Sequence, residues 1–474
     1  MANVNKVTGV SAGSISKIDG VSKSGISKID GQTLADPAPF ITEWTVGAGV
    51  TITLPSYGGT FSYTVDWGDE TAIETGVTAL NKTHEYTDAG TYTVTITGTF
   101  PSLRMSSGTA DNALCLRKLV QWGTDCTWRT LCQIFKTCTN LVYEATDAPN
   151  LTGLSSLGGN RTFTSPFEGC DAIIDLDLSG WSNTDDFTDF FYAFYGLDYV
   201  ESINLTGWDM SGGRQERMFY FTGQSGSGVD ITLTDAILGS GSCYYMFRNV
   251  KFSGNPALDV ADASNITNVQ SLFYMADGNV SIDLSTWDFP DSCTTLASIA
   301  YQSEINSFTF SNSADFSEVT TLSSAFNDCP NLTTVTFPSN ADFAKVTNMY
   351  RVFYYADNLT TVDFGEDQDF SAVTDWEYTW RKNTIGAPHP IVSVNFLTTT
   401  DIQSTTALSG LFRDSQLATI DYDRLLQALD NAGNDDGVLV ATLSNYTTAG
   451  DGGTAHGNLL AVERGWSITD AGGV

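Results

Sequence analysis

The stretch from Asn331 to Gly365 reads NLTTVTFPSNADFAKVTNMYRVFYYADNLTTVDFG and contains one pattern twice. An alternating, strand-like run is centred on Val335, a polar loop follows it, and a short apolar run ends at Phe353. The strand-like run then returns at Val362, 27 residues after its first appearance. A period of this size is typical of stacked supersecondary units, because none of them can bury its apolar face alone.

The residue that closes each apolar run marks the repeat along most of the chain. Eight of the ten gaps between successive markers are 25 to 28 residues long. The markers are Phe135, Phe167, Phe194, Phe219, Phe247, Phe273, Ile299, Phe326, Phe353, Trp380 and Phe412. We interpret the apolar runs as short helices, which predicts an α+β repeat: a solenoid of about eleven repeats whose core lengthens with each added unit.

Composition and charge exclude several classes of protein. The chain is 41% hydrophobic and only 16% charged, which indicates an ordered, loop-rich β protein. The formal net charge is −33, and because residues 1–34 contribute +2, the rest of the chain has −35. Such a charge argues against nucleic-acid binding through a phosphate-neutralising face. No apolar run approaches the roughly 20 residues of a membrane span, so we expect no membrane insertion.

The eight cysteines show no metal-binding pattern. Cys138, Cys170 and Cys329 each lie three residues after a marker, where a small buried side chain is expected, so we predict free thiols in the core. A bridge or metal site that joins Cys126 to Cys132 or Cys138 stays open as an alternative, although the chain has no CxxC pair.

Residues 1–35 contain a second, shorter repeat with a step of 11 residues. Each copy is a short strand followed by a turn, as at Asp19-Gly20 and Asp30-Gly31. Thirty residues cannot bury a core, so we expect an anchor that adds strands to a neighbouring protein or oligomerises; a flexible tail is the alternative. The apolar anchor residues are Ile15, Ile18, Ile26 and Ile29.

The next segment, residues 36–101, has motifs of a known module. Val65-Asp66-Trp67-Gly68-Asp69, His84-Glu85-Tyr86 and Ala89-Gly90-Thr91-Tyr92-Thr93-Val94-Thr95 resemble the PKD domain. The resemblance implies an immunoglobulin-like β-sandwich that acts as a spacer or weak adhesion unit, with Trp67 in its core and a turn at Asp66 to Asp69. Asp66, Asp69 and Glu70 offer calcium-type ligands, but turn carboxylates are more often local hydrogen-bond acceptors, so we predict no metal.

From about Leu103 onward the sequence resembles the leucine-rich repeat of BspA-type surface proteins. The resemblance depends on FxxC marks and on DLSxW strands at Asp177–Trp181 and Asp283–Trp287. It implies no catalytic residues, and a PKD-like module followed by this repeat is similar to surface-exposed bacterial and phage proteins. The expected organisation is an anchor, a PKD-like module, a solenoid cap, the leucine-rich-repeat solenoid and a C-terminal cap at residues 1–35, 36–101, 102–134, 135–420 and 421–474.

The sequence predicts neither an enzyme nor a cofactor. Its three histidines, His84, His389 and His456, have no serine, cysteine or metal partner at a usable spacing. A solenoid offers surfaces instead. The residue after the central apolar position of each strand points away from the core. These short polar residues, which form a predicted ladder for glycan or protein contact, are Asp177, Asn204, Thr232, Asp259, Asp283, Thr309, Thr336, Asp363, Asn395 and Asp421.

Tyrosines form a second row beside the markers, for example Tyr195, Tyr220, Tyr274 and Tyr354. Exposed tyrosines at this density are typical of interfaces, although they also pack between successive repeats.

The ISKIDG repeat resembles N-terminal segments of phage virion proteins, and the first residues lack the apolar run of a secretory signal. We therefore expect a protein of the virion surface: a head fibre, capsid decoration or tail fibre. Residues 1–34 would contact other virion proteins, and the solenoid would contact a host-surface protein or polysaccharide. The alternatives are a bacterial cell-surface adhesin of BspA type and a purely structural virion cement.

Overall fold

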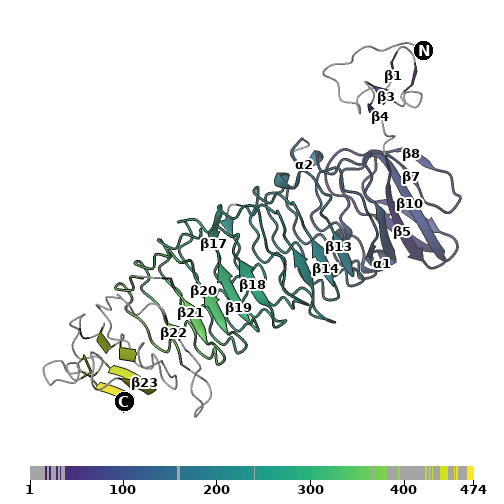
Figure 1. Cartoon of the computed structure of the whole chain (residues 1–474). Helices are drawn as coiled ribbons and strands as arrows, with labels where there is room; N and C mark the ends of the chain where they lie inside the picture. The colour runs from purple at the N-terminus through teal and green to yellow at the C-terminus, as the bar shows by residue number, and fades with distance from the viewer. Residues whose placement is uncertain are drawn as a thin grey trace.

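The computed structural model of the chain is an elongated, mostly β structure (Figure 1). It describes residues 38–156, 161–239, 241–365 and 368–381, four short strands within residues 17–33, strand 393–394, and parts of 422–474. Helix is scarce in these described ranges. Between residues 38 and 381 it consists of α1 (Ala110–Cys115), α2 (Gly153–Ser156) and two 3₁₀ turns, η3 (Met105–Ser107) and η4 (Thr184–Asp186).

The N-terminal repeat contains the expected short strands. Strand β1 (Lys17–Ile18) pairs with β2 (Val21–Ser22), and β3 (Lys28–Ile29) pairs with β4 (Gln32–Thr33). Both pairs are antiparallel, and only two residues separate the strands of each pair, as the Asp-Gly turns predict. The anchor positions Ile18 and Ile29 lie in β1 and β3, whereas Ile15 and Ile26 lie outside the described residues.

The following module has one four-stranded sheet and one strand pair. The sheet joins β5 (Phe40–Val46), β10 (Gly90–Thr99), β7 (Ser62–Asp66) and β8 (Glu74–Val77), while β6 (Val50–Leu54) pairs with β9 (Lys82–Tyr86). Trp67 is buried, as predicted, and its ring stacks on His84 at a centroid distance of 4.6 Å.

The predicted turn after β7 is also present. The backbone N–H of Gly68 donates to Asp66 over 3.0 Å, and Gly68 has φ +76°. A Cβ there would lie 2.5 Å from the carbonyl oxygen of Thr93, so glycine is required. Burial raises the pKa of Asp69, but hydrogen bonds from Thr71 and His84 outweigh it and lower that pKa overall. Both carboxylates are therefore local acceptors.

The module and the solenoid share one sheet, in the order β12-β11-β5-β10-β7-β8. Strand β11 (Leu116–Gln121) is antiparallel to β5, and β12 (Val142–Tyr143) is parallel to β11. The cores are continuous as well, because Phe40 contacts both Trp122 and Trp128, at ring-centroid distances of 6.2 and 5.1 Å. The module thus covers the first apolar layer of the solenoid.

Parallel strands stack along the solenoid in two main sheets (Figure 1). Their positions agree with the sequence repeat. The first sheet contains β13 (Asp175–Asp177), β14 (Ser202–Asn204) and β15 (Asp230–Thr232); the second contains β18 (Ser281–Leu284), β19 (Ser307–Phe310), β20 (Thr334–Thr336), β21 (Thr361–Asp363) and β22 (Ser393–Val394). Between them lies a short pair, β16 (Gly241–Ser242) and β17 (Ile266–Asn268).

The apolar runs are not helices, so the predicted α+β repeat is wrong in the described turns. Two residues of each run, four positions apart, have the left-handed conformation, which interrupts a right-handed helix; in the run of Tyr378 the second position lies outside the described residues. The first of them is Gln133, Ser165, Tyr192, Arg217, Tyr245, Ser271, Ser298, Ser324, Arg351 and Tyr378. The second, in the same order, is Thr137, Gly169, Gly196, Phe221, Asn249, Met275, Gln302, Asp328 and Tyr355.

This conformation directs backbone hydrogen bonds to the next turn of the solenoid. The N–H groups of Ser324, Phe326 and Asp328 donate to carbonyls 26 residues ahead, over 2.8, 2.8 and 2.6 Å. Alternate N–H groups form tight local bonds, such as that of Ala325 to the carbonyl of Leu322. The runs are therefore part of a β-solenoid of about nine turns.

Marker side chains stack through the core. Phe194, Phe219, Phe247 and Phe273 lie ring on ring, with successive centroid distances of 5.2, 5.3 and 4.9 Å. The next marker was assigned wrongly. The backbone N–H of a marker such as Phe247 or Phe326 donates to the carbonyl of the residue just before the next marker, and the N–H of Phe273 donates to the carbonyl of Ile299. The marker of that turn is therefore Ala300.

Phe308 of β19 compensates for this small residue. The equivalent position in β20 and β21 holds valine, at Val335 and Val362. The Phe308 ring contacts Phe273 and Phe326 edge to face, at 5.9 and 5.3 Å, and so occupies the place between two markers that Ala300 leaves empty. A large residue on one side of the turn thus offsets a small one on the other.

All eight cysteines are free, among them Cys138, Cys170 and Cys329, which are buried in the core as predicted. Six of them are buried, and Cys170 and Cys329 direct their thiols at carbonyls of the preceding turn, over 3.1 and 2.8 Å. Burial raises the pKa of Cys329 to about 12 and that of Cys293 to about 11. Deprotonation to the reactive thiolate is therefore suppressed.

We expect iodoacetamide to modify only Cys115 and Cys132 in the native protein at pH 8, because these two are half-buried and the other six are buried. In urea all eight should react. Peptide mass spectrometry after a timed quench reads each site separately. Rapid modification of Cys329 in the native protein would contradict the packing described above.

The C-terminal segment contains two parallel strands, β23 (Val438–Tyr446) and β24 (Ser467–Gly473). Asp470 accepts a hydrogen bond from the Tyr422 hydroxyl over 2.9 Å and lies 3.2 Å from Nε2 of His456. His456 is thus part of a polar network in this segment. The last marker, Phe412, lies outside the described residues.

Candidate functional site

The predicted ladder of polar residues is in register along both main sheets. In the first sheet, Asp177 lies opposite Asn204, which lies opposite Thr232. In the second sheet the aligned residues are Asp283, Thr309, Thr336 and Asp363. These seven residues are exposed or half-buried. Two further members, Asn395 and Asp421, lie outside the described residues.

The acidic and amide members of this ladder have a local structural task. Asp177, Asp283 and Asp363 each accept a hydrogen bond from the backbone N–H two residues later, over 3.1, 2.9 and 2.9 Å. Asn204 does the same for Thr206 and also accepts from its hydroxyl. Such bonds turn the chain at the strand end. Part of the acceptor capacity of this face is therefore used by the fold.

Asp259 does not belong to the ladder, so this assignment was wrong. Thr232 is bridged to Ala257, which takes the ladder position in that turn. The side chain of Asp259 instead accepts a hydrogen bond from the Thr234 hydroxyl over 2.7 Å. The weak copy of the repeat between Ala257 and Asp262 shifts the register by two residues, which the sequence pattern did not reveal.

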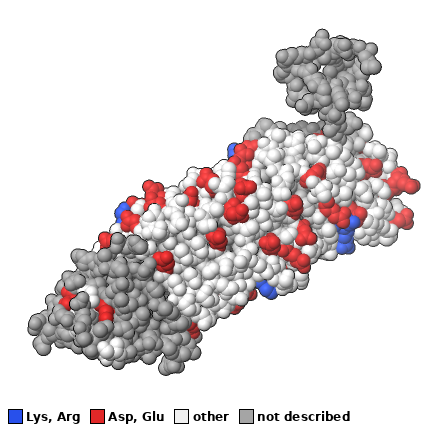
Figure 2. Space-filling model, viewed as in Figure 1, with Lys and Arg blue, Asp and Glu red and all other residues white. Residues whose placement is uncertain are grey.

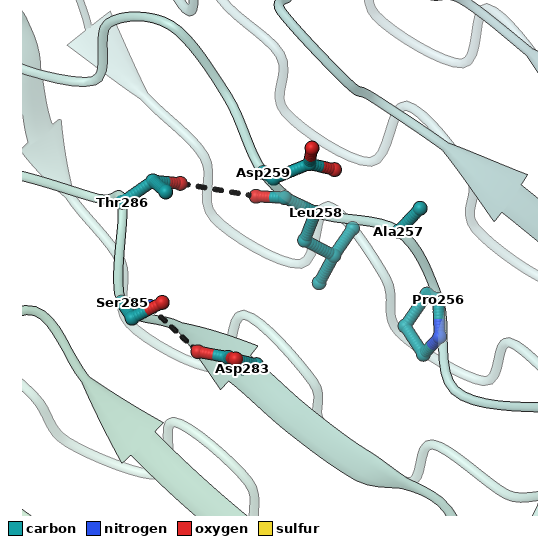
Figure 3. Close-up of a pocket in the computed structure, with 7 residues that line it drawn as sticks. All are labelled: Pro256, Ala257, Leu258, Asp259, Asp283, Ser285 and Thr286. Carbon is teal, nitrogen blue, oxygen red and sulfur yellow. Dashed lines mark hydrogen bonds between the residues drawn. The ribbon is translucent and has the colours of Figure 1, made fainter.

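A shallow notch lies where this irregular turn meets β18 (Figure 3). Its volume is about 160 Å³, and it is lined by Pro256, Ala257, Leu258, Asp259, Asp283, Ser285 and Thr286. Figure 3 shows Ser285 and Thr286 bonded within the lining, Ser285 to Asp283 and Thr286 to the carbonyl of Leu258. The two carboxylates are exposed, which gives the notch an acidic rim without a buried polar group to orient a ligand.

Figure 2 shows one face of the molecule, where acidic side chains are scattered over a largely uncharged surface and basic ones are few. Among the described residues, no group of three or more His, Cys, Asp or Glu side chains is arranged to hold a metal ion. In the same part of the chain, no helix combines the length and the apolar character needed to cross a membrane.

The tyrosine row forms a second face of the solenoid, on the side where the apolar runs of successive turns stack. The markers point inward, whereas in most runs the residues two before and one after the marker are half-exposed; Ser165, Ser271 and Asn327 are the buried exceptions. Tyr195 stacks on Tyr220 at 5.6 Å, and Tyr274 stacks on Tyr301 at 5.0 Å. The rings therefore pack between successive turns and also stay in contact with solvent.

Sequence reasoning missed the arginines of this face. Arg217 and Arg351 precede their markers by two residues, and Arg248 and Arg381 follow theirs by one. Their guanidinium groups lie 4.4 to 5.9 Å from the centroids of neighbouring tyrosine rings, within the range of cation–π attraction. The spacing Arg-x-x-Tyr and Tyr-x-x-Arg beside a marker was the available signal.

Comparison with known proteins gives one family match. Residues 241–362 and 294–416 each match a family model described as "Mycoplasma protein of unknown function, DUF285". The two matches overlap and cover less than half of the chain, all of it within or next to the second half of the solenoid. Neither the curated proteins nor the solved structures contain a match to this chain.

Proposed function

We propose that the chain is a non-enzymatic structural and adhesion protein of a phage particle, displayed as a head fibre, capsid decoration or tail fibre. Residues 1–34 attach it to other virion proteins, and the solenoid faces outward to contact a host-surface protein or polysaccharide. The carrying observation is the regular presentation of surface side chains: polar residues stay in register over successive parallel strands, and the tyrosine row follows the same stacking.

The proposal includes a finer assignment of the two larger parts. We assign the module of β5 to β10 to the PKD type and the solenoid to the BspA-type leucine-rich repeats. The buried Trp67 and the turn at Gly68 support the first assignment, and the 27-residue period supports the second. The continuous sheet from β8 to β12 favours a stiff rod over two parts on a flexible joint.

The chemistry of the described histidines supports a role without catalysis. His84 stacks on Trp67 and pairs with Asp69 at 2.7 Å, and His456 pairs with Asp470. The cysteine thiols with raised pKa values are poor nucleophiles. These groups hold the fold together and leave the surface as the functional part.

A bacterial cell-surface adhesin of BspA type is the second candidate. The match to a family described as a Mycoplasma protein favours it, because that description names a cellular source. A purely structural cement is the third candidate, and it predicts that loss of the protein weakens the particle while adsorption to the host is unchanged.

The attachment role of residues 1–34 can be tested by binding to purified candidate particles. We expect the full chain to bind and residues 35–474 to stay monomeric and unbound, because the two short strand pairs, β1 with β2 and β3 with β4, would gain further strands from a protein of the particle. A full-length variant with Ile15, Ile18, Ile26 and Ile29 changed to serine tests the same segment without truncation, and it should also fail to bind. If both truncated and full chains bind cells and neither binds particles, the adhesin candidate is correct.

A further inference from the structure

The same arrangement of two arginines and two tyrosines occurs twice on the tyrosine face. In the first quartet, one turn provides Arg217 and Tyr220 and the next provides Tyr245 and Arg248. In the second quartet, one turn provides Arg351 and Tyr354 and the next provides Tyr378 and Arg381. In both, the first turn places arginine before the marker and tyrosine after it, and the second turn reverses the order.

The two quartets share three equivalent contacts between arginine and tyrosine. Arg217 lies 5.7 Å from the ring centroid of Tyr245, and the equivalent Arg351 lies 5.7 Å from Tyr378. Arg248 lies 4.4 Å from Tyr245 and 5.3 Å from Tyr220. In the second quartet, the corresponding distances from Arg381 are 5.1 Å to Tyr378 and 5.8 Å to Tyr354. Each arginine therefore bridges rings of adjacent turns.

The fold does not need these residues. In three turns between the quartets the position before the marker holds Ser271, Ser298 and Ser324, with the same left-handed backbone. The left-handed conformation at this position, two residues before the marker, favours small or amide residues and not arginine or tyrosine. Their use in two separate pairs of turns points to a task at the surface.

The charge of the quartets is also unusual for this chain. Between residues 163 and 381 there are only seven basic residues, and four of them form the quartets; the seven are Arg214, Arg217, Arg248, Lys251, Lys345, Arg351 and Arg381. Arg214 and Lys345 pair with carboxylates. None of the four quartet arginines has an ion pair with a carboxylate of the described residues, so their positive charge is available to an anion.

From the repeated quartets we infer that this face binds an acidic polysaccharide, with one uronic-acid unit at each quartet. The tyrosine rings offer flat surfaces for the apolar faces of sugar rings, and the planar guanidinium groups match a carboxylate. A polyphosphate offers no ring to stack, and a neutral glycan offers no charge. The inference rests on the proposed adhesive function and specifies the ligand of that function.

The spacing of the quartets favours a repetitive polymer. Equivalent residues of the two quartets, such as Arg217 and Arg351, are offset by five turns, which at the ~4.8 Å spacing of stacked strands is about 24 Å along the solenoid. One extended chain can engage both sites, so the second contact becomes intramolecular and raises the apparent affinity. Tyr274, which lies 4.9 Å from Arg248, and Tyr301 continue the ring surface from the first quartet toward the second.

The test is binding of the full-length protein to polygalacturonate, measured by biolayer interferometry, with dextran and polyphosphate as comparison polymers. We expect tight binding to polygalacturonate alone. Arg217→Gln with Arg248→Gln, or Arg351→Gln with Arg381→Gln, should each weaken binding by about tenfold or more, since avidity is lost with either site. All four changes together should abolish it. Lys251→Gln with Lys345→Gln removes two charges outside the quartets and should change binding less than about twofold.

Circular dichroism of each variant separates lost binding from lost fold. If a glutamine variant is unfolded, the corresponding arginine-to-lysine variant, which keeps the charge but not the planar fork, should still show weakened binding. Unchanged binding of the folded four-residue variant, no binding of polygalacturonate by the parent, or equal binding of polyphosphate would each overturn the inference. The particle-binding assay of residues 1–34 does not depend on the quartets, so failure here is distinct from failure of the proposed function.

Discussion

Ala300→Phe and Phe308→Val should each destabilise the protein, and the double variant should be more stable than either single one. Phenylalanine at residue 300 meets the Phe308 ring that already lies between Phe273 and Phe326, and such overpacking costs about 1–3 kcal/mol. Phe308→Val alone leaves a cavity beside Ala300, at a cost of about 2–3 kcal/mol. Together the two changes restore the marker and valine pair of the neighbouring turns.

Urea unfolding followed by circular dichroism measures this coupling. We expect an interaction free energy of about 1–3 kcal/mol between the two changes, the range found for residues in contact. Val335→Phe is the control. It places a phenylalanine at the position equivalent to Phe308 in a turn whose marker, Phe326, is already large, so it should destabilise the protein and no second change in this pair should rescue it. Additive effects of the two test changes would show that Ala300 is not the marker of its turn.

The period of the repeat and the positions of the strands could be predicted because they depend on buried residues that recur in the sequence. β20 and β21 lie where Val335 and Val362 placed them. The error at Ile299 arose because a marker was identified by size. The register is set by backbone hydrogen bonds, which place Ala300 there, and no pattern of apolar residues distinguishes a marker from the buried residue before it.

The local structure of the apolar runs could not be predicted from their spacing. Four or five residues such as those ending in Phe353 fit one helical turn as well as they fit a compact bend. The deciding feature is the left-handed backbone at Arg351 and Tyr355, residue types that rarely adopt it in isolation. Stacking on the next turn supplies the hydrogen bonds that hold it, so the conformation is a consequence of the assembled solenoid.

The candidate surfaces were likewise predictable where the repeat is regular and not where they depend on how the turns stack. The ladder was predicted correctly at Asp283 through Asp363, where the repeat is regular, and wrongly at Asp259, where it is not. The quartets were missed because each turn of the solenoid contains only half of one. Arg217 and Tyr245 are 28 residues apart and meet only when the turns stack, which the tyrosine count alone did not suggest.

Trp122→Ala should have the largest effect of any single change at the junction of the module and the solenoid. Trp122 is fully buried and contacts Phe40 of the module at 6.2 Å, and Trp128 and Trp181 of the solenoid at 5.6 and 5.5 Å. Its indole N–H donates to the Tyr143 hydroxyl over 3.0 Å. Truncation of a buried tryptophan costs about 3–5 kcal/mol.

The form of the unfolding curve is more informative than the midpoint. With the shared sheet and the shared aromatic core intact, the module and the first turns should unfold together. Without Trp122 the β5 to β11 pairing and the contact of Phe40 with Trp128 remain, but the ring that joins Phe40 to Trp181 is lost, so we expect two transitions in differential scanning calorimetry. Tyr199→Ala, at a side chain that is 52% exposed, is the control and should shift stability by less than about 0.5 kcal/mol. If Trp122→Ala lowers one transition without splitting it, the backbone ladder and the contact of Phe40 with Trp128 are enough to couple the two parts. In that case the Trp122 ring contributes stability but not cooperativity, and the module is a cap held by the shared sheet and the remaining aromatic contact.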